Sequence, residues 1–389
     1  MGRYQSYLNT AKTIIQQYSG EEPFATFARK FYSVNKKYGS TDRRIITHLC
    51  YCFFRAGKAA SKLLFEDRLL AALFLCSNEP NEILGEFRPG WNQQTALSFK
   101  QKLSLVDGSF GEEVFPWKDE LSDGINHKEF IESFFVQPDL FLRVRPGHEK
   151  AVLKKLQASS IPFEIISPTC LAMPNASKID SVLELNAEAV VQDYNSQKTG
   201  DFFFPVTRTS PGKVWDCCAA SGGKSIMLYD LYPAADLTVS DIRESIIANL
   251  KKRFKEAGIK NYEVIVADLR VSDFKFKDSD FDFIIADVPC SGSGTWSRTP
   301  EQLYYFKKEK IDEYASLQKR IVSNVVSRLK PGGYLLYITC SAFRKENEEM
   351  IAYINKDYHL QTIRMELLNG YDKKADTMFA ALLQRPLLS

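Results

Sequence analysis

The 389-residue sequence predicts an α/β protein whose C-terminal half is a doubly wound, largely parallel sheet. From about residue 205 onward, short apolar runs alternate with amphipathic helical stretches, as such a sheet requires. Residues near 135–204 show the mixed pattern of a small α+β module, and residues 1 to about 130 have helical spacing. We therefore expect an all-α domain over 1–130, a small module over 131–204 and the sheet domain over 205–389.

The composition is that of an ordinary globular protein, with 44% hydrophobic and 25% charged residues. No run approaches the roughly 20 apolar residues of a membrane span, and the N-terminus does not have the pattern of a signal peptide. The eight cysteines form no CxxC pair and no ligand-like spacing with histidine, which disfavours structural zinc and a disulfide scaffold. We expect a protein of the reducing cytoplasm, without metal.

In the N-terminal part, a capping sequence at Ser40 precedes apolar residues with helical spacing, and Phe65–Cys76 indicates a second helix. Helices joined by short polar segments predict a bundle. The acidic, turn-rich stretch 108–124 is expected to be a linker or a long loop. Four aromatic residues are expected in the core of the bundle rather than as platforms for bases: Phe24, Phe27, Phe31 and Tyr32.

Charge is distributed unevenly although the net charge is only +3. Residues 1–64 carry eleven Lys and Arg against three Asp and Glu, whereas residues 65–135 carry six against thirteen. A basic N-terminal face is compatible with binding a phosphate backbone, and equally with a solvated helical surface. Both interpretations stay open on charge alone.

The small module begins with a strand, because Asp139–Arg145 alternates and ends at the turn signal Pro146-Gly147. Lys150–Gln157 indicates a short amphipathic helix, and residues 163–166 indicate a further strand. Such a module could bind RNA or pack against the domain that follows, and its local basic charge favours RNA. The basic residues are Arg143, Arg145, Lys150, Lys154 and Lys155.

The sheet domain is predicted to be Rossmann-like. Its first strand, Val214–Cys218, opens into Ala219–Ser225, a loop with two glycines, and then into an amphipathic helix. The second strand, Leu237–Asp241, is followed by a helix over Glu244–Ala257 that ends at Gly258. Further strands are expected at Glu263–Asp268, up to Asp287, up to Cys340, near 359–365 and near 377–384, which completes seven.

Three successive strands end in an acid, at Asp241, Asp268 and Asp287. The carboxyl ends of parallel strands line one edge of a sheet, so these side chains are expected to converge on one crevice. The glycine-rich turn lets the backbone approach a ligand there. Neither GxGxxG nor GxxxxGK[ST] is present, which disfavours NAD and ATP. A ligand with adenine and ribose but no phosphate fits better, and S-adenosylmethionine is such a ligand.

Two cysteines follow buried strands at this edge, Cys290 and Cys340. Thiols beside a methyl donor indicate covalent catalysis on cytosine, whose C5 is too poor a nucleophile to take a methyl group directly. If a thiolate adds to C6, C5 becomes enamine-like and can attack the sulfonium methyl; loss of the C5 proton and release of the thiol restore the ring. This chemistry needs one cysteine of lowered pKa and a nearby group that manages the proton. Cys217 and Cys218 are interpreted as core or loop residues.

The motifs resemble those of the Sun/RsmB-type RNA (cytosine-C5) methyltransferases. They are Asp216-x-Cys218-Ala-Ala-Ser-Gly-Gly-Lys224, Asp287-Val-Pro-Cys290-Ser-Gly-Ser-Gly, Thr339-Cys340-Ser341 with Glu346-Asn-Glu348, and Gln192-Asp193-x-x-Ser196-Gln197. The resemblance implies that Cys340 is the nucleophile and that Cys290 assists turnover. It implies further that Lys224 and Asp287 contact the target base as well as the cofactor. The residues that it places around S-adenosylmethionine are Cys218, Ala219, Ala220, Ser221, Gly222, Gly223, Lys224, Asp241, Asp268 and Asp287.

Similar bacterial enzymes place a NusB-like helical domain first and an RNA-recognition-like module second, which agrees with the domain order expected here. One departure is Ser221, where the family usually has proline. Proline would stiffen this loop, whereas serine loses that rigidity and adds a hydroxyl.

We therefore expect a monomeric, S-adenosylmethionine-dependent RNA (cytosine-C5) methyltransferase, with ribosomal RNA as its partner. Two alternatives stay open, the same chemistry on transfer RNA and a non-catalytic RNA-binding assembly factor with this fold. An amino-group methyltransferase is set aside, because it would carry Asn/Asp-Pro-Pro-aromatic where this chain has Asp287-Val-Pro-Cys290.

Overall fold

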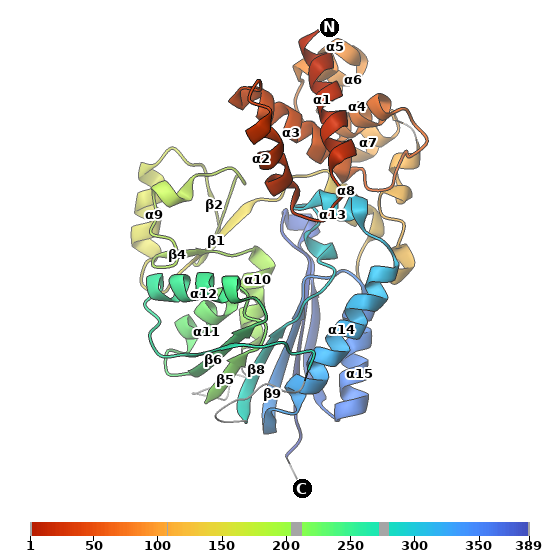
Figure 1. Cartoon of the computed structure of the whole chain (residues 1–389). Helices are drawn as coiled ribbons and strands as arrows, with labels where there is room; N and C mark the ends of the chain where they lie inside the picture. Colours follow the sequence, from red (N-terminus) through yellow and green to blue (C-terminus); the bar gives the residue numbers. More distant parts are fainter. Residues whose placement is uncertain (1, 107, 204–211, 272–279, 388–389) are drawn as a thin grey trace. The chain divides into compact units, whose positions relative to one another are not determined.

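The computed structural model describes residues 2–106, 108–203, 212–271 and 280–387 (Figure 1). These residues form two compact units, which are described separately. The helical unit comprises Met1–Asp119, Asn126–Gln137 and Thr295–Lys307, and the sheet unit comprises Glu120–Ile125, Pro138–Gly294 and Lys308–Ser389. The domain boundary expected at 204/205 falls in 204–211, outside the described residues. The three-domain division stays a prediction.

The helical unit confirms the helical N-terminal part. Helix α3 begins at Ser40, and Asp42 in its first turn accepts a hydrogen bond from the backbone N–H of Gly39 (3.0 Å). The helices are α1 (Arg3–Gln17), α2 (Phe24–Val34), α3 (Ser40–Arg55), α4 (Phe65–Cys76), α5 (Glu82–Phe87), α6 (Pro89–Asn92), α7 (Phe99–Leu103), α8 (His127–Phe134) and α13 (Pro300–Tyr305).

Aromatic rings fill the core of the helical unit. Phe24 is fully buried, with its ring centroid 5.2 Å from that of Tyr18 and 5.0 Å from that of Phe54. Helix α13, from far along the chain, completes this core, because Glu301 accepts a hydrogen bond from the backbone N–H of Phe24 (3.2 Å). The expected core position is confirmed for Phe24 and for Tyr32, whereas Phe27 and Phe31 are half-buried.

The stretch 108–124 is irregular, as expected for a linker or a long loop, and the boundary between the two units falls within it, between Asp119 and Glu120. It contains the short 3-10 turns η1 (Gly108–Phe110), η2 (Glu112–Val114) and η3 (Lys118–Glu120). Phe115 is fully buried, with its ring centroid 6.0 Å from that of Trp296, and Trp117 is buried beside it. The acidic composition of the stretch does not reveal that these two aromatic side chains are buried. The part of the loop that contains them belongs to the core.

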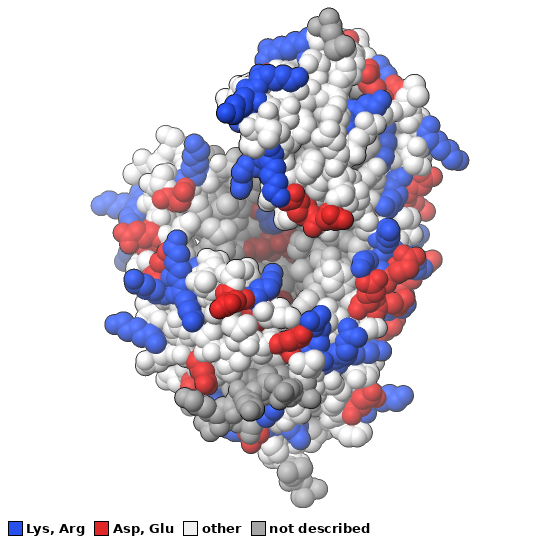
Figure 2. Space-filling model, viewed as in Figure 1, with Lys and Arg blue, Asp and Glu red and all other residues white. Residues whose placement is uncertain are grey.

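The basic character of residues 1–64 is visible at the surface of the helical unit. Figure 2 shows Lys and Arg side chains over α2 and the turn that follows it. Lys30 pairs there with Glu22 (2.8 Å), so part of the charge is neutralised locally. The exposed basic residues of this region are Arg29, Lys30, Lys36 and Lys37.

The sheet unit begins with the predicted small module, a four-stranded antiparallel sheet with strand order β2-β3-β1-β4. The helix of this module buries Val152 and Leu156 against Leu142 and Leu171 of the sheet. The elements are β1 (Leu140–Val144), α9 (Glu149–Ala158), β2 (Glu164–Ser167), β3 (Cys170–Met173) and β4 (Ala189–Val191).

Two of the basic residues predicted to favour RNA have a packing role instead. Arg143 and Arg145 are nearly buried and both bind the carboxylate of Asp230, at 2.6 and 2.7 Å. Asp230 lies on α11 (Gly223–Leu231), the helix that follows the predicted glycine-containing loop at Ala219–Ser225. Lys150 and Lys154 stay exposed, and Lys155 pairs with Glu188 (2.7 Å). The two arginines therefore attach the module to the large sheet.

The large sheet has seven strands in the order β10-β11-β9-β8-β5-β6-β7, which confirms the predicted Rossmann-like sheet. Strand β11 is antiparallel to its neighbours β9 and β10, and the other pairs are parallel. The strands are β5 (Lys213–Asp216), β6 (Asp236–Asp241), β7 (Glu263–Val266), β8 (Phe281–Asp287), β9 (Leu329–Thr339), β10 (Gln361–Leu368) and β11 (Met378–Gln384).

Helices cover both faces of this sheet (Figure 1). On one face, α11 and α12 (Glu244–Glu256) pack on Val214, Phe283 and Leu336. On the other face, α14 (Glu309–Val326) and α15 (Glu348–Tyr358) pack on Trp215, Ile284 and Leu335. Neighbouring strand residues thus point to opposite faces, which is why the strands are continuous apolar runs. No helix among the described residues is both long and apolar enough to cross a membrane.

Candidate active site

A cavity of about 520 Å³ opens at the carboxyl edge of the large sheet. Residues that follow β5, β6, β7, β8 and β9 line it, together with Leu317 and Ile321 of α14. The strands are parallel, so their ends meet at this edge, as expected for a ligand crevice. Seven of the predicted site residues line the cavity: Cys218, Ala220, Asp241, Asp268, Asp287, Cys290 and Cys340.

The two candidate catalytic thiols lie side by side. The Sγ atoms of Cys290 and Cys340 are 3.3 Å apart, although fifty residues separate them in the chain. Backbone hydrogen bonds fix their loops, since the N–H of Gly294 donates to the carbonyl of Cys340 (2.9 Å) and the N–H of Thr377 donates to the carbonyl of Gly294 (2.9 Å). A Cβ at position 294 would lie 2.0 Å from the Thr377 carbonyl oxygen, so only glycine fits there.

A buried carboxyl and a serine cluster support both loops from behind. Glu346 accepts hydrogen bonds from the backbone N–H of Ser291 (2.9 Å), the hydroxyl of Ser341 (2.6 Å) and the side-chain amide of Gln318 (2.9 Å). The hydroxyls of Ser291 and Ser341 are 3.1 Å apart. Burial raises the pKa of Glu346. The Glu346-Asn-Glu motif therefore clamps the two cysteine loops, a role that the sequence did not reveal.

Asn347 adds a second clamp on the Cys340 loop. Its side chain accepts a hydrogen bond from the hydroxyl of Thr339 (2.5 Å) and donates to the carbonyl of Ser341 (2.8 Å). The residues on either side of Cys340 are thus both held by one amide.

Lys224 brings positive charge to the thiols. Its Nζ lies 2.7 Å from Asp287 Oδ2. Burial alone would lower the pKa of Lys224, but the carboxylate of Asp287, together with Cys340 nearby, raises it on balance. The pKa of Cys290 is raised well above its usual range by the sulfur of Cys340 beside it and by burial. The neutral thiol is therefore the favoured form of Cys290.

Two further acids line the cavity, Asp241 at the end of β6 and Asp268 after β7. Asp241 accepts hydrogen bonds from the backbone N–H groups of Ala220 (3.2 Å) and Arg243 (2.9 Å). Asp268 forms an ion pair with Arg270 (2.6 Å), and this partner lowers the pKa of the carboxyl. The apolar wall beside the acids was not predicted, and neither were the two arginines. The lining residues that sequence analysis missed are Cys217, Ile242, Arg243, Ala267, Leu269, Arg270, Val288, Pro289, Leu317 and Ile321.

The glycine-rich loop joins β5 to α11 below the cavity. Ala220 has φ +45° and Gly222 has φ +80°, so the chain turns sharply twice. Asp216 before the loop is buried and accepts a hydrogen bond from Ser225 (2.6 Å); burial raises the pKa of Asp216 to about 7. Of the predicted loop residues, Cys218 and Ala220 line the cavity, whereas five do not: Ala219, Ser221, Gly222, Gly223 and Lys224.

The segment before the described part of the large sheet supports the site indirectly. Gln192 accepts a hydrogen bond from Arg143 (2.8 Å), and Asp193 caps α10 (Tyr194–Lys198) by accepting from the N–H of Asn195 (2.9 Å). The hydroxyl of Ser196 lies 3.5 Å from Lys224 Nζ. The motif therefore places one helix next to the Lys224–Asp287 pair.

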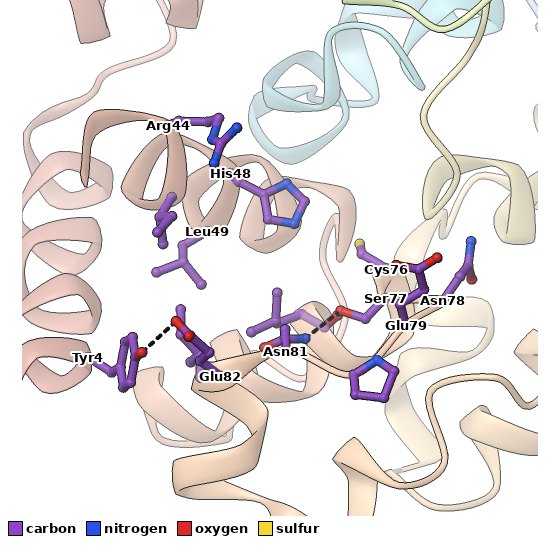
Figure 3. A pocket seen from close by; sticks show the side chains of 14 residues that line it. Tyr4, Arg44, His48, Leu49, Cys76, Ser77, Asn78, Glu79, Asn81 and Glu82 are labelled. Carbon is purple, nitrogen blue, oxygen red and sulfur yellow. Dashed lines mark hydrogen bonds between the residues drawn. The ribbon is translucent and has the colours of Figure 1, made fainter. Parts of the chain in front are cut away.

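The helical unit contains a larger cavity of about 700 Å³ (Figure 3). Figure 3 shows Arg44 and His48 of α3 at one side, and Tyr4 donating a hydrogen bond to Glu82 (2.5 Å). Its lining mixes acids, bases and amides, and it contains a single cysteine, Cys76, rather than a pair of facing thiols. The described residues contain no group of three or more His, Cys, Asp or Glu side chains placed to hold a metal ion. The sheet-edge cavity is therefore the candidate active site.

Comparison with known proteins gives relatives for this part of the chain. Residues 207–383 match the family described as 16S rRNA methyltransferase RsmB/F. The chain is 29% identical over 246 residues to ribosomal RNA small subunit methyltransferase B of Enterobacter sp. (strain 638), covering 60% of this chain and 55% of the relative. It is 31% identical over 232 residues to the protein of that name from Shewanella oneidensis, covering 58% and 53%. The chain thus spans about half the length of the curated relatives it matches.

Solved structures share the fold. PH0851 superimposes with a TM-score of 0.72 at 18% identity, covering 99% of both chains. NSun6 from Pyrococcus horikoshii, solved with SFG, gives a TM-score of 0.56 at 13% identity, covering 70% of this chain and 96% of the other. Residues 207–383, which include the two thiols and the acids of the cavity, are thus similar to the RsmB/F methyltransferase family, in agreement with the motifs.

Proposed function

We propose that the chain is an S-adenosylmethionine-dependent RNA (cytosine-C5) methyltransferase that acts on ribosomal RNA through a covalent adduct between Cys340 and C6 of the base. The observation that carries this proposal is the pair of sulfurs 3.3 Å apart at the edge of a cavity rimmed by acids. The match of residues 207–383 to a 16S rRNA methyltransferase family and the names of the relatives support the choice of ribosomal RNA.

The cavity fits the cofactor by its chemistry. Asp241 offers carboxylate oxygens to ribose hydroxyls, and Ile242 and Leu269 offer apolar surface to an adenine ring. The positive φ of Ala220 turns loop backbone toward the same space. NSun6, which has this fold, was solved with SFG, an analogue of S-adenosylmethionine. The cofactor, when bound, supplies an electrophilic methyl group on its sulfonium.

The first chemical step uses Cys340. Lys224, paired with Asp287, places a positive charge near the sulfur of Cys340. This sulfur adds to C6 of cytosine, and the electron pair of the C5–C6 double bond becomes available for attack by C5 on the methyl group. The target base must leave its stack to reach this position.

The second step releases the product. Solvent water accepts the C5 proton, the double bond re-forms, and the C6–S bond breaks so that Cys340 leaves as a thiolate. Cys290 lies within contact of that sulfur and holds its own proton, because its pKa is raised by Cys340 and by burial. Its S–H group can therefore donate a hydrogen bond to the departing thiolate of Cys340, which stabilises the negative charge on that sulfur and favours release.

The roles predict different behaviour for the two variants. Cys340→Ala removes the nucleophile and should abolish transfer of labelled methyl groups to ribosomal RNA. Cys290→Ala should form the adduct but release it slowly, so that a covalent enzyme–RNA band accumulates on denaturing gels. Cys76→Ala, a half-buried free thiol of the helical unit, is the matched control and should behave as the wild type.

Undiminished turnover by Cys340→Ala would refute the assignment. Methylation of transfer RNA but not of ribosomal RNA would leave the proposed chemistry intact and change the substrate. Bisulfite sequencing of total RNA from a deletion strain would locate the modified position. RNA binding without any affinity for S-adenosylmethionine would instead indicate a non-catalytic assembly factor.

A further inference from the structure

The loop between β5 and α11 contains an alanine whose backbone conformation is rare for residues other than glycine. Ala220 has φ +45°, in the left-handed region, and it lines the candidate active site. Such a conformation persists only where the surrounding structure over-determines it. The contacts of residues 220–222 therefore show what shapes the loop.

Two neighbours hold the loop from opposite sides. Towards the cavity, Asp241 accepts the hydrogen bond from the N–H of Ala220 (3.2 Å). From α12, Arg253 Nη1 donates to both the carbonyl (2.8 Å) and the hydroxyl (2.6 Å) of Ser221. Gly222 packs so closely on α12 that a Cβ would lie 2.6 Å from the ring of Phe254.

Arg253 is itself fixed by the small module. Its Nε donates to the side-chain oxygen of Asn186 (2.9 Å), in the connection between β3 and β4. The side-chain amide nitrogen of Asn186 donates in turn to the carboxylate of Glu256 (2.8 Å). The backbone carbonyl of Asn186 accepts a hydrogen bond from Arg145 (2.9 Å). One half-buried guanidinium thus connects a loop of the module to the loop of the active site.

We infer that Arg253 is a positioning residue that fixes the Ala219–Gly223 loop for the cofactor, and that Asn186 supports it from the small module. Serine at 221 lacks the ring that restrains proline, and the two hydrogen bonds from Arg253 supply the restraint instead. This inference rests on the proposed cofactor, S-adenosylmethionine. It adds that a residue of the RNA-recognition-like module affects the affinity for that cofactor.

The experiment measures the dissociation constant of S-adenosylmethionine by calorimetry and the kinetics of methyl transfer for the full chain. Arg253→Gln should raise Kd and KM for the cofactor about tenfold, while kcat at saturating cofactor stays near the wild-type value. Asn186→Ala should raise both about threefold, although it lies outside the cavity. Lys251→Gln removes the same charge from the exposed side of α12 and should change neither.

Ser221→Ala separates positioning from general destabilisation. It removes the hydroxyl but leaves the backbone contact, so it should raise Kd by about threefold. Combined with Arg253→Gln it should add nothing, because both changes remove the same interaction. If the double variant shows the product of the two effects, or if Arg253→Gln binds the cofactor as tightly as the wild type, the inference is overturned. A wild-type protein without affinity for the cofactor would overturn the proposed function itself.

Discussion

A single buried carboxyl, Asp216, links the stability of the sheet unit to pH. It is 1% exposed at the end of β5, and burial raises its pKa from 3.8 to about 7. Below about pH 4 the carboxyl is protonated in both the folded and the unfolded chain. Between about pH 4 and pH 7 the unfolded chain loses this proton while the folded chain keeps it, so the free energy of unfolding falls as the pH rises.

Asp216→Asn should remove this dependence, because the amide is neutral at every pH. Relative to the wild type, the variant should gain stability as the pH rises from about 4 to 7, by about 4 kcal/mol at most, and the difference should level off above that. Urea unfolding at several pH values measures this, with Asp236→Asn as an exposed control. Parallel pH curves for wild type and variant would contradict the expectation.

Individual residues differ in how far the sequence could predict them. Cys290 and Cys340 could be selected because each follows an apolar strand run, and sheet topology then brings the strand ends together. The charge of Arg143 and Arg145 favours RNA binding in the sequence analysis, because composition shows a charge but not its partner. That partner, Asp230, lies 85 residues beyond Arg145. The sequence shows Glu346 only as part of a motif. Its supporting role depends on a contact with Ser291, 55 residues earlier, which no local pattern reveals.

At the scale of elements, the loop after β8 depends on one close backbone approach. Gly294 lies between the carbonyl oxygens of Thr377 and Cys340, at a distance that excludes a Cβ. The same glycine makes backbone hydrogen bonds to both residues. This loop therefore keeps its shape through backbone contacts with the residue before β11 and with the residue after β9.

Gly294→Ala should force the loop apart and move Cys290 away from Cys340. We expect methyl transfer to fall about 100-fold, because a displacement of about 1 Å can cost that much. The stability should fall by about 1–3 kcal/mol, as in other overpacked sites. Gly90→Ala, where a Cβ meets nothing within 4 Å, is the control. Wild-type activity in Gly294→Ala would show that the loop adapts and that the close approach is unimportant.

The elements themselves were largely predictable. Buried strands that are continuous apolar runs, and a helix that ends before a glycine, carry their signals locally, and this explains why the sequence predicts the β5–β11 region nearly correctly. The turn-rich stretch 108–124 was assigned as a possible linker because its polar residues outnumber the apolar anchors Phe115 and Trp117. Packing of such isolated side chains depends on partners that no local pattern shows.

At the scale of whole units, a buried ion cluster fastens the small module to the large sheet. Asp230 is 4% exposed in its side chain and binds two arginines that are 8% and 11% exposed. Removing the carboxylate would leave two guanidinium groups buried without their counterion. Such groups are costly, because their desolvation is no longer offset.

Asp230→Ala should therefore lower the free energy of unfolding by about 3–5 kcal/mol. Lys154→Ala, at an exposed position of α9, should change it by no more than about 0.5 kcal/mol. Thermal and denaturant unfolding of the full chain would measure both. A loss for Asp230→Ala no greater than for Lys154→Ala would show that the cluster contributes no net attachment.

The helical unit also includes Thr295–Lys307, the stretch that immediately follows the Cys290 loop in the sequence. This determines where the chain can be cut into fragments that fold. Trp296 and Tyr305 pack among aromatic rings contributed by residues before 119. A truncated protein that starts at residue 205 would keep these two side chains but lose their surroundings, so that Thr295–Lys307 would become an unpacked apolar segment. The sheet unit is thus not a portable module: gene fragments that begin after the N-terminal helices should yield aggregating protein without the proposed activity, however complete their methyltransferase motifs.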